Sequence, residues 1–432
     1  MEIVDCRAEK GLRRIEKISR AAFFDEEVES AVAGILNKVR RMGDKALIEF
    51  TQKFDNYSLS PAAIKVKDEI LDLAFSNLPK GLLASLKFSR KNIEEYAKKQ
   101  LKKSWAIKRK DGSEIGLEVR PIEKVGVYVP GGTAPLVSTV LMTVLIARVA
   151  GVKEIYVATP PCCGGDINPA VLGACRFSGV DAVFRIGGAQ AVAAFAFGTE
   201  SIPRVDKIIG PGNIFVSCAK KQVYGLVDVD MVAGPSEVMI VADKSAKIPY
   251  AAADMLAQAE HDASSRIFLV SDSVAVLEEA EREAYKQAMK LSRKRILSES
   301  LRNNTFLVLV RDKKQAVDVI NLIGPEHLEI MSEDADYILK RTDNAGAVFV
   351  GDWSPEAVGD YIAGPSHVLP TGGRARFFSA LSVSDFLKNI STIRYSRDGL
   401  RKASKYAIEL SDTEGLGAHG NSIKIRLKEN CR

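Results

Sequence analysis

The chain contains only four histidines, and each lies in a short string rich in acidic residues, glycine or proline. Imidazole binds zinc and transfers protons near neutral pH. Burial can raise the pKa of a carboxyl group, so that it also transfers protons in this range. Such strings are unusual surroundings for core histidines, so all four are candidates for a metal or acid–base site. They are His261, His327, His367 and His419.

Gln258 and His261 lie three residues apart in LAQAEHDAS, on a helix that we expect to begin at Pro249 and to end near His261. Residues at this spacing share a helix face, so both side chains can reach one point. With Asp254 they form a polar stripe. The stripe suits a pair of metal ligands, although a solvated surface is the more ordinary explanation.

The string GPEHLEI places Glu326 beside His327 directly after Gly-Pro. A rigid turn would hold a carboxylate and an imidazole together, as general acid–base catalysis requires. An acidic residue that favours a helix N-terminus is an equally good explanation of this string alone.

Two further strings could complete a zinc site, which takes histidine nitrogens and carboxylate oxygens. Sequence spacing cannot show that their residues meet, and neither HExxH nor a cysteine-based zinc motif occurs. The loop 351–367 offers Asp352, Glu356, Asp360 and His367, and the string TEGLGAHGNS offers Glu414 and His419.

Covalent catalysis is disfavoured by the sequence. Ser236 lies in AGPSEV, which is not a GxSxG nucleophile elbow. The six cysteines form no CxxC pair, and we expect reduced thiols in a cytosolic protein.

The elements that must position these residues change character along the chain. The first 120 residues are expected to be mainly helical. From Val125, strands alternate with helices and glycine-rich turns, which predicts a parallel sheet that binds ligands at the carboxyl ends of its strands. A second α/β stretch begins near Gly234, and the tail from Leu381 is expected to contain a helix and a final strand at Ser422–Leu427.

The glycine turns VPGGTAP, IGGAQA and IGPGN place backbone amides at predicted helix starts, where phosphates bind well. The standard GxGxxG fingerprint is absent. A phosphate-bearing cofactor is therefore a reasonable expectation, although a plain tight turn explains each string equally well.

The bulk properties exclude several classes of partner. Of the 432 residues, 46% are apolar and 27% are charged, and the net charge of +6 is mild for this length. It calls for neither nucleic acid nor a membrane surface. The N-terminal residues lack a signal peptide's apolar region, and Val137–Val152 is too short to span a bilayer, so we expect a cytoplasmic protein.

Taken together, these strings resemble the histidinol dehydrogenase family. From about residue 120 to the end, the following appear in the family's order: VGVYVPGGTAPLVSTVLM, RIGGAQAVAAFAFGTE, KIIGPGNIFV, DMVAGPSEVMIVAD, LAQAEHD, GPEHLEI, GDWSPEAVGDY, GPSHVLPTGG and EGLGAHGNS. So many ordered motifs are far more specific than any one of them.

The resemblance implies roles for individual residues. Glu326 and His327 match the family's acid–base pair. Its zinc ligands, one ion per subunit, correspond to Gln258, His261, Asp360 and His419. Substrate contacts correspond to these four, His327, Ser236 and Glu414, with His367 a further candidate, and NAD contacts correspond to Tyr128, Gln190 and Asn213.

The resemblance also implies an α/β fold with two variant, incomplete Rossmann-like parallel-sheet domains. We expect an N-terminal helical arm (1–25), a first α/β domain (26–120 with 235–380), an NAD-binding domain (121–234) and a C-terminal tail (381–432). The family forms homodimers whose tail reaches the partner's active site, so Glu414 and His419 are expected to act across subunits.

The implied function is the NAD-dependent, four-electron oxidation of L-histidinol to L-histidine through a bound aldehyde, at the end of histidine biosynthesis. The nearest alternative is a related zinc and NAD dehydrogenase that oxidises another primary alcohol, such as a sulfonated diol. A zinc hydrolase is disfavoured by the glycine-rich turns, and a catalytically silent binding protein is disfavoured by the complete set of polar residues.

Overall fold

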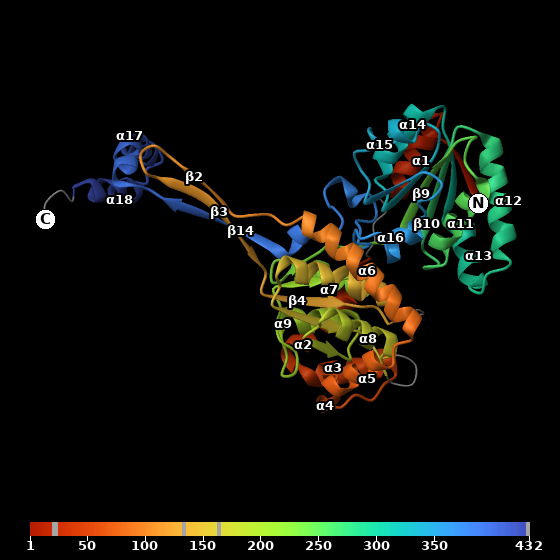
Figure 1. Cartoon of the computed structure of the whole chain (residues 1–432), viewed down its shortest axis with the longest axis horizontal. Helices are drawn as coiled ribbons and strands as arrows, with labels where there is room; N and C mark the ends of the chain where they lie inside the picture. The colour runs from red at the N-terminus through yellow and green to blue at the C-terminus, as the bar shows by residue number, and fades with distance from the viewer. Residues whose placement is uncertain (20–24, 132–134, 162–165, 429–432) are drawn as a thin grey trace. The chain divides into compact units, whose positions relative to one another are not determined.

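The structure, a computed structural model of the chain, describes residues 1–19, 25–131, 135–161 and 166–428 (Figure 1). It contains two compact units. The larger comprises Met1–Gln100 and Ile122–Asp385, and the smaller comprises Leu101–Pro121 and Phe386–Arg432. Two parallel sheets in the larger unit confirm the expected α/β class.

The first sheet of the larger unit has six parallel strands in the order β1-β11-β10-β9-β12-β13. They are β1 (Glu2–Asp5), β9 (Glu237–Ala242), β10 (Arg266–Ser271), β11 (Thr305–Leu309), β12 (His327–Met331) and β13 (Ala347–Val350). The helices around it are α1 (Glu9–Ser19), α11 (Ile248–Ala259), α12 (Val274–Ala288), α13 (Lys294–Asn303), α14 (Lys313–Ile323), α15 (Ala335–Leu339) and α16 (Glu356–Tyr361). Apolar residues of α11–α13 form one core with the sheet, and those of α1, α14 and α15 form another. The strands are consequently buried on both faces, as parallel strands usually are.

The second sheet has five parallel strands in the order β6-β5-β4-β7-β8. They are β4 (Lys124–Tyr128), β5 (Glu154–Ala158), β6 (Ala182–Phe184), β7 (Lys207–Ile209) and β8 (Asp228–Val229). One group of mutually contacting helices is α5 (Asp68–Ser76), α6 (Lys80–Lys99), α7 (Val137–Ala150) and α8 (Pro169–Ser178). The other group is α2 (Glu26–Met42), α3 (Asp44–Asp55), α9 (Gly188–Phe197) and α10 (Ile214–Val223), with the short α4 (Pro61–Ile64) beside α3. Side chains of alternate strand residues pack into the core formed by this second group, so the two groups cover opposite faces.

The strand order of the second sheet reverses between β4 and β7, and backbone packing at this point is close. Gly210, directly after β7, has φ +109°, and a Cβ there would lie 2.2 Å from the carbonyl oxygen of Tyr128. Only glycine fits this position. Open α/β sheets bind ligands at the carboxyl ends of their strands, at the point where the strand order reverses.

The helices near the N-terminus are distributed differently from the expected domains. Residues 2–5 form an edge strand paired with β11, and α1 packs against α14, so the first residues belong to the six-stranded sheet. Helices α2 and α3 pack against α9 of the five-stranded sheet, because Val32, Ile35 and Leu47 join its apolar core.

The smaller unit contains a three-stranded antiparallel sheet, in the order β14-β3-β2, and two helices. Its elements are β2 (Trp105–Lys108), β3 (Glu114–Pro121), β14 (Leu387–Arg394), α17 (Arg397–Thr413) and α18 (Gly417–Lys428). The predicted final strand at Ser422–Leu427 is wrong, since these residues lie in α18, which packs against α17. The mainly helical first part ends with α6 at Lys99, and residues 105–121 form the hairpin of β2 and β3.

No helix in the described ranges is long and apolar enough to cross a membrane. The apolar stretch Val137–Val152 contains α7, whose 14 residues are mostly buried.

Candidate active site

The predicted acid–base pair lies at the amino ends of β9 and β12. Parallel pairing places His327 opposite Val238, next to Glu237. Glu326 precedes β12, and Gly346 lies beside it, because the Gly346 N–H donates to the carbonyl of Pro325 at 2.9 Å. A Cβ at Gly346 would lie 2.5 Å from the Glu326 carbonyl oxygen, so the absent side chain lets the two strands start this close together.

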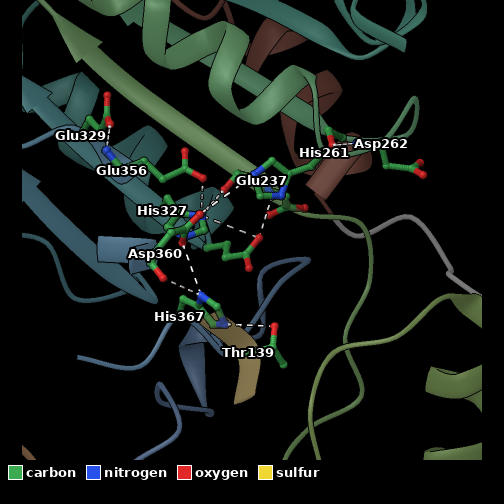
Figure 2. A network of polar contacts seen from close by, with 11 residues as sticks. Thr139, Glu237, His261, Asp262, His327, Glu329, Glu356, Asp360 and His367 are labelled. Carbon is green, nitrogen blue, oxygen red and sulfur yellow. Dashed lines mark hydrogen bonds and ion pairs between the residues drawn. The ribbon is translucent and has the colours of Figure 1, made fainter. Parts of the chain in front are cut away.

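His327 is buried and is held by its Nδ1 atom, which lies 3.2 Å from the carbonyl oxygen of Glu237 (Figure 2). A carbonyl can only accept, so Nδ1 carries the hydrogen and Nε2 keeps its lone pair. Nε2 lies 3.9 Å from Oδ1 of Asp360. Burial lowers the pKa of His327 to about 4, against the opposing charge of Asp360. The imidazole is therefore a neutral base at physiological pH.

Glu326 is also buried, and its Oε2 accepts a hydrogen bond of 2.8 Å from the N–H of Glu237. Burial raises the pKa of Glu326 well above its usual value, and the Glu237 N–H opposes this shift. Its carboxylate is 3.9 Å from Nδ1 of His327. The two side chains predicted to act as a pair therefore lie close together.

A group of possible metal ligands also lies beside His327, since Oε1 of Glu356 is 3.6 Å from its Nδ1. One donor atom each from His261, Glu356 and Asp360 falls within 4.8 Å of the others. His261 follows α11, and the two carboxylates belong to α16, which contacts α11. In Figure 2, His327, Glu356 and Asp360 point toward one another. Imidazole nitrogen with carboxylate oxygen is a donor set that suits zinc.

Gln258 fits a metal site through its unsatisfied side chain. It is fully buried in α11, and neither its Oε1 nor its Nε2 has a hydrogen-bond partner among the described residues. The N–H of His261 donates to the Gln258 carbonyl at 3.3 Å, so the two residues occupy the same turn. An unpaired buried amide is costly, and coordination of its oxygen would remove part of that cost.

Further carboxyl groups surround the metal-ligand group. Oε1 of Glu329 in β12 accepts from the N–H of Glu356 at 2.7 Å and so fixes the start of α16. Burial and the neighbouring Asp254 raise the pKa of Glu329 to about 9. Burial raises the pKa of Asp254 to about 6 and that of Glu237 to about 7. Such a concentration of buried acids favours a bound cation, because protons must otherwise neutralise several of them.

His367 connects this site with the second sheet. Its Nδ1 lies 3.1 Å from the carbonyl oxygen of Asp360, and its Nε2 lies 3.4 Å from the hydroxyl of Thr139 (Figure 2). Thr139 belongs to the first turn of α7, which follows the carboxyl end of β4. The amino edge of one sheet and the carboxyl edge of the other are consequently neighbours.

The residues predicted to contact NAD lie at the carboxyl edge of the five-stranded sheet. The Tyr128 hydroxyl accepts a hydrogen bond of 3.1 Å from the N–H of Gly188 at the start of α9. Gln190, in the same turn, is buried, and its Oε1 has no partner within the described ranges. Asn213 caps α10 by accepting from the N–H groups of Phe215 and Val216. Of the glycine turn VPGGTAP, residues 132–134 lie outside the described residues.

The remaining predicted residues divide between the two units. Ser236 directly precedes Glu237, and its carbonyl accepts from the N–H of Arg266 at 2.9 Å, so it borders the acid–base pair. Glu414 and His419 belong to the smaller unit, where Glu414 ends α17 and His419 lies in the first turn of α18. Both are exposed.

Two carboxylates at the site lie outside the predicted set. Glu356 was noted only as part of its loop, and Glu237 had no signal, because it follows Ser236 in a string that reads simply as the start of a strand. Both are nevertheless buried beside His327. Cys6, Cys175 and Cys218 are buried free thiols, whereas Cys162, Cys163 and Cys431 lie outside the described residues.

Comparison with known proteins agrees with this geometry. The histidinol dehydrogenase family model matches residues 18–427. The chain belongs to the histidinol dehydrogenase family. The histidinol dehydrogenase of Clostridium acetobutylicum is 46% identical over 402 residues, 93% of each chain. That of Bacillus cereus is 43% identical over 430 residues, 99% of this chain and 100% of the other.

Solved structures support the same assignment. The crystal structure of histidinol dehydrogenase from Elizabethkingia anophelis matches with a TM-score of 0.93 and 34% identity, covering 99% of this chain and 98% of that one. An acetylating aldehyde dehydrogenase from Geobacillus thermoglucosidasius matches with a TM-score of 0.50 and 15% identity, covering 90% of this chain and 97% of that one. The second likeness concerns the fold alone.

Proposed function

We propose that this protein catalyses the NAD-dependent, four-electron oxidation of L-histidinol to L-histidine through a bound aldehyde, as its family membership indicates. The observation that carries the proposal is the buried Glu326–His327 pair beside the group formed by His261, Glu356 and Asp360. An acid–base pair next to a cation site suits a substrate that has an alcohol to deprotonate and nitrogen atoms to bind.

Zinc would be held by Gln258, His261 and Asp360, with His419 as a fourth ligand. When bound, the ion supplies a positive charge that holds the amino alcohol in one orientation beside the nicotinamide. NAD accepts a hydride in each of the two oxidations, so two NADH are formed for each substrate consumed.

In the first oxidation, Nε2 of His327 takes the proton of the alcohol as hydride leaves its carbon. The carbonyl of Glu237 fixes the ring's tautomer, and burial keeps the ring neutral. The N–H of Glu237 stabilises the carboxylate of Glu326, and burial makes that carboxylate a stronger base. Glu326 then removes a proton from the water that adds to the aldehyde, and the second hydride leaves the resulting hydrate.

NAD would bind at the carboxyl edge of the five-stranded sheet, at Tyr128, Gln190 and Asn213. The reversal of strand order between β4 and β7 supports this position. The contact between His367 and Thr139 supports it further, because it brings this edge next to the acid–base pair, as hydride transfer requires. His367, Ser236 and Glu414 would contact the substrate.

We also propose a homodimer in which Glu414 and His419 enter the partner's active site. The smaller unit offers apolar side chains for such an interface. Trp105 and Ile107 on β2 and Ile393 on β14 lie on one face of the three-stranded sheet and are 53–72% exposed. An apolar surface of this kind is typical of a protein interface.

The experiment is a spectrophotometric NADH assay with L-histidinol on zinc-loaded protein, with and without a chelator. We expect two NADH per L-histidinol, loss of activity on chelation, and recovery when zinc is restored. Zinc-loaded protein that forms no NADH from L-histidinol but oxidises a sulfonated diol would overturn the substrate assignment.

A further inference from the structure

Two unpaired polar atoms lie on the side of the five-stranded sheet that is covered by α9. Gln190 is 1% exposed, and its Oε1 has no hydrogen-bond partner among the residues that the structure describes. The same is true of Oδ2 of Asp55, a half-buried residue at the end of α3 that none of the assigned roles uses. Buried polar atoms are normally paired, so both call for a ligand.

The packing of α3 places Asp55 near Gln190. At the other end of α3, the N–H of Asp44 donates to Glu200, and Ser201 donates to the Asp44 carboxylate. These partners follow the C-terminal end of α9, and α3 and α9 are in contact. The segment that follows α3 returns to the start of α9, because the N–H of Arg185 donates to the carbonyl of Ile64 in α4 at 2.8 Å. The C-terminal end of α3 therefore lies toward the N-terminal end of α9.

Tyr128 provides a second link between these groups. Its hydroxyl accepts from the N–H of Gly188, in the same turn as Gln190. The negative charge of Asp55 contributes, after burial, to raising the pKa of Tyr128, so the carboxylate lies within electrostatic reach of that hydroxyl. Asp55, Tyr128 and Gln190 thus converge on one end of α9.

The position of this end relative to the reaction centre identifies the part of the cofactor that would occupy it. Thr139, which contacts His367, belongs to α7 on the opposite face of the sheet. The nicotinamide must lie on the α7 side, because hydride leaves the substrate there. A dinucleotide that crosses the carboxyl edge would then bring its adenosine half to the α9 side.

We propose that Asp55 accepts a hydrogen bond from a ribose hydroxyl of the cofactor's adenosine half and thereby selects NAD over NADP. A carboxylate oxygen is a strong acceptor for a sugar hydroxyl, and it repels the 2′-phosphate that distinguishes NADP. The carboxylate comes from a helix outside the sheet, whereas the usual dinucleotide fold supplies one from the end of a strand. The inference rests on the proposed binding of NAD at this edge.

The test is direct titration of NADH and NADPH, followed by fluorescence, on the full-length protein without substrate. For Asp55→Asn we expect NADH to bind about tenfold or more weakly, because a charge-assisted hydrogen bond is lost. The preference for NADH over NADPH should fall by a similar factor. A reduced cofactor that lacks the adenosine 2′-hydroxyl should bind the wild type and Asp55→Asn equally.

Asp68→Asn, at an exposed position on α5, serves as the matched control and should leave both affinities unchanged. If Asp55→Asn unfolds, Asp55→Glu keeps the charge and should keep the preference for NADH. Unchanged NADH affinity and unchanged preference in folded Asp55→Asn would overturn the inference. Normal titrations from a protein that does not oxidise L-histidinol would instead count against the proposed function alone.

Discussion

At the scale of single residues, His327 owes its role to one backbone atom. The carbonyl of Glu237 holds the proton-bearing Nδ1 and leaves Nε2 free toward Asp360. Because the contact comes from a paired strand, the ring is oriented by the sheet rather than by a flexible side chain. His327 is the first residue of β12, so the strand begins at the histidine that its neighbouring strand orients.

The two members of the acid–base pair should affect different steps. His327→Ala should slow the oxidation of L-histidinol by about a hundredfold or more, because the alcohol loses its base. Glu326→Ala should slow the oxidation of L-histidinaldehyde more than the formation of aldehyde. Single-turnover NADH formation from each substrate separates the two effects. Equal loss of both steps in Glu326→Ala would contradict the assigned roles.

Glu356 should contribute to metal affinity, although sequence reasoning did not select it. Its carboxylate lies within 4.8 Å of donor atoms of His261 and Asp360, and its ionised form would be stabilised by a dication. We expect Glu356→Ala to weaken zinc binding about tenfold to a hundredfold, measured by competition with a chromophoric chelator.

Asp352→Asn is the matched control for Glu356→Ala. Asp352 lies in the same loop and pairs with Lys247 at 3.3 Å, outside the metal-ligand group. The Asp352→Asn variant should bind zinc with the affinity of the wild type. Wild-type zinc affinity in Glu356→Ala would show that the carboxylate only shapes the cavity.

The sequence predicted some of these residues because adjacency or helical spacing linked them. Glu326 is next to His327 in the sequence, and Gln258 precedes His261 by about one turn of helix. Glu237 lies some 90 positions from His327, and only the pairing of β9 with β12 brings them together. Neither that pairing nor its register can be deduced from the periodicity of one strand.

At the scale of secondary-structure elements, the buried carboxyl groups tie α11, β12 and α16 together. Glu329 in β12 fixes the first N–H of α16 and lies against Asp254 of α11. Both helices carry proposed metal ligands. The spacing of these ligands consequently depends on a contact between acids that requires a shared proton or a nearby cation.

This contact should make the stability of the metal-free protein depend on pH. Burial raises the pKa of Glu329 from 4.5 to about 9, so between these values the folded chain holds a proton that the unfolded chain has lost. Stability should therefore fall as pH rises through this range, by at most about 1.4 kcal/mol per pH unit for one proton. Denaturant unfolding between pH 6 and 9 measures the slope.

Glu329→Gln mimics the protonated acid permanently and should reduce the slope in the metal-free protein by the share of one proton, leaving the share of the other buried acids. Glu69→Gln, at an exposed position on α5, should leave the slope as it is. A slope that Glu329→Gln does not change would show that other groups cause the dependence.

Elements were predictable where local pattern and packing agree. The alternating strands and helices from Val125 onward are such a case. Ser422–Leu427 is the opposite case, because its alternation of polar and apolar residues predicts a strand. No strand of the described sheets pairs with it, and packing of α18 against α17 makes it helical.

At the scale of the whole molecule, the proposed zinc ligands are divided between the sequence ranges of the two compact units. Gln258, His261 and Asp360 belong to the larger unit, and His419 belongs to the smaller. Exchange of the smaller unit between two chains would give each active site residues from both.

Mixing two inactive variants should restore activity if His419 acts across subunits. His327→Ala removes the proposed base, and His419→Ala removes the proposed zinc ligand that the partner subunit would supply. After subunit exchange, a hybrid dimer would have one site with both histidines intact, so random mixing should restore about a quarter of wild-type activity. The NADH assay before and after mixing measures this. Activity that stays at the level of the separate variants would show that each chain supplies its own His419.

Position 346 limits how far this enzyme can be altered. A methyl group there would press on the carbonyl of Glu326, so the start of β12 would have to shift and would carry Glu326 and His327, the proposed acid–base pair, with it. A displacement of about 1 Å at a reacting group can cost about a hundredfold in rate. Gly346→Ala should therefore lower turnover even where the protein stays folded, because a single added methyl group would displace both proposed acid–base residues.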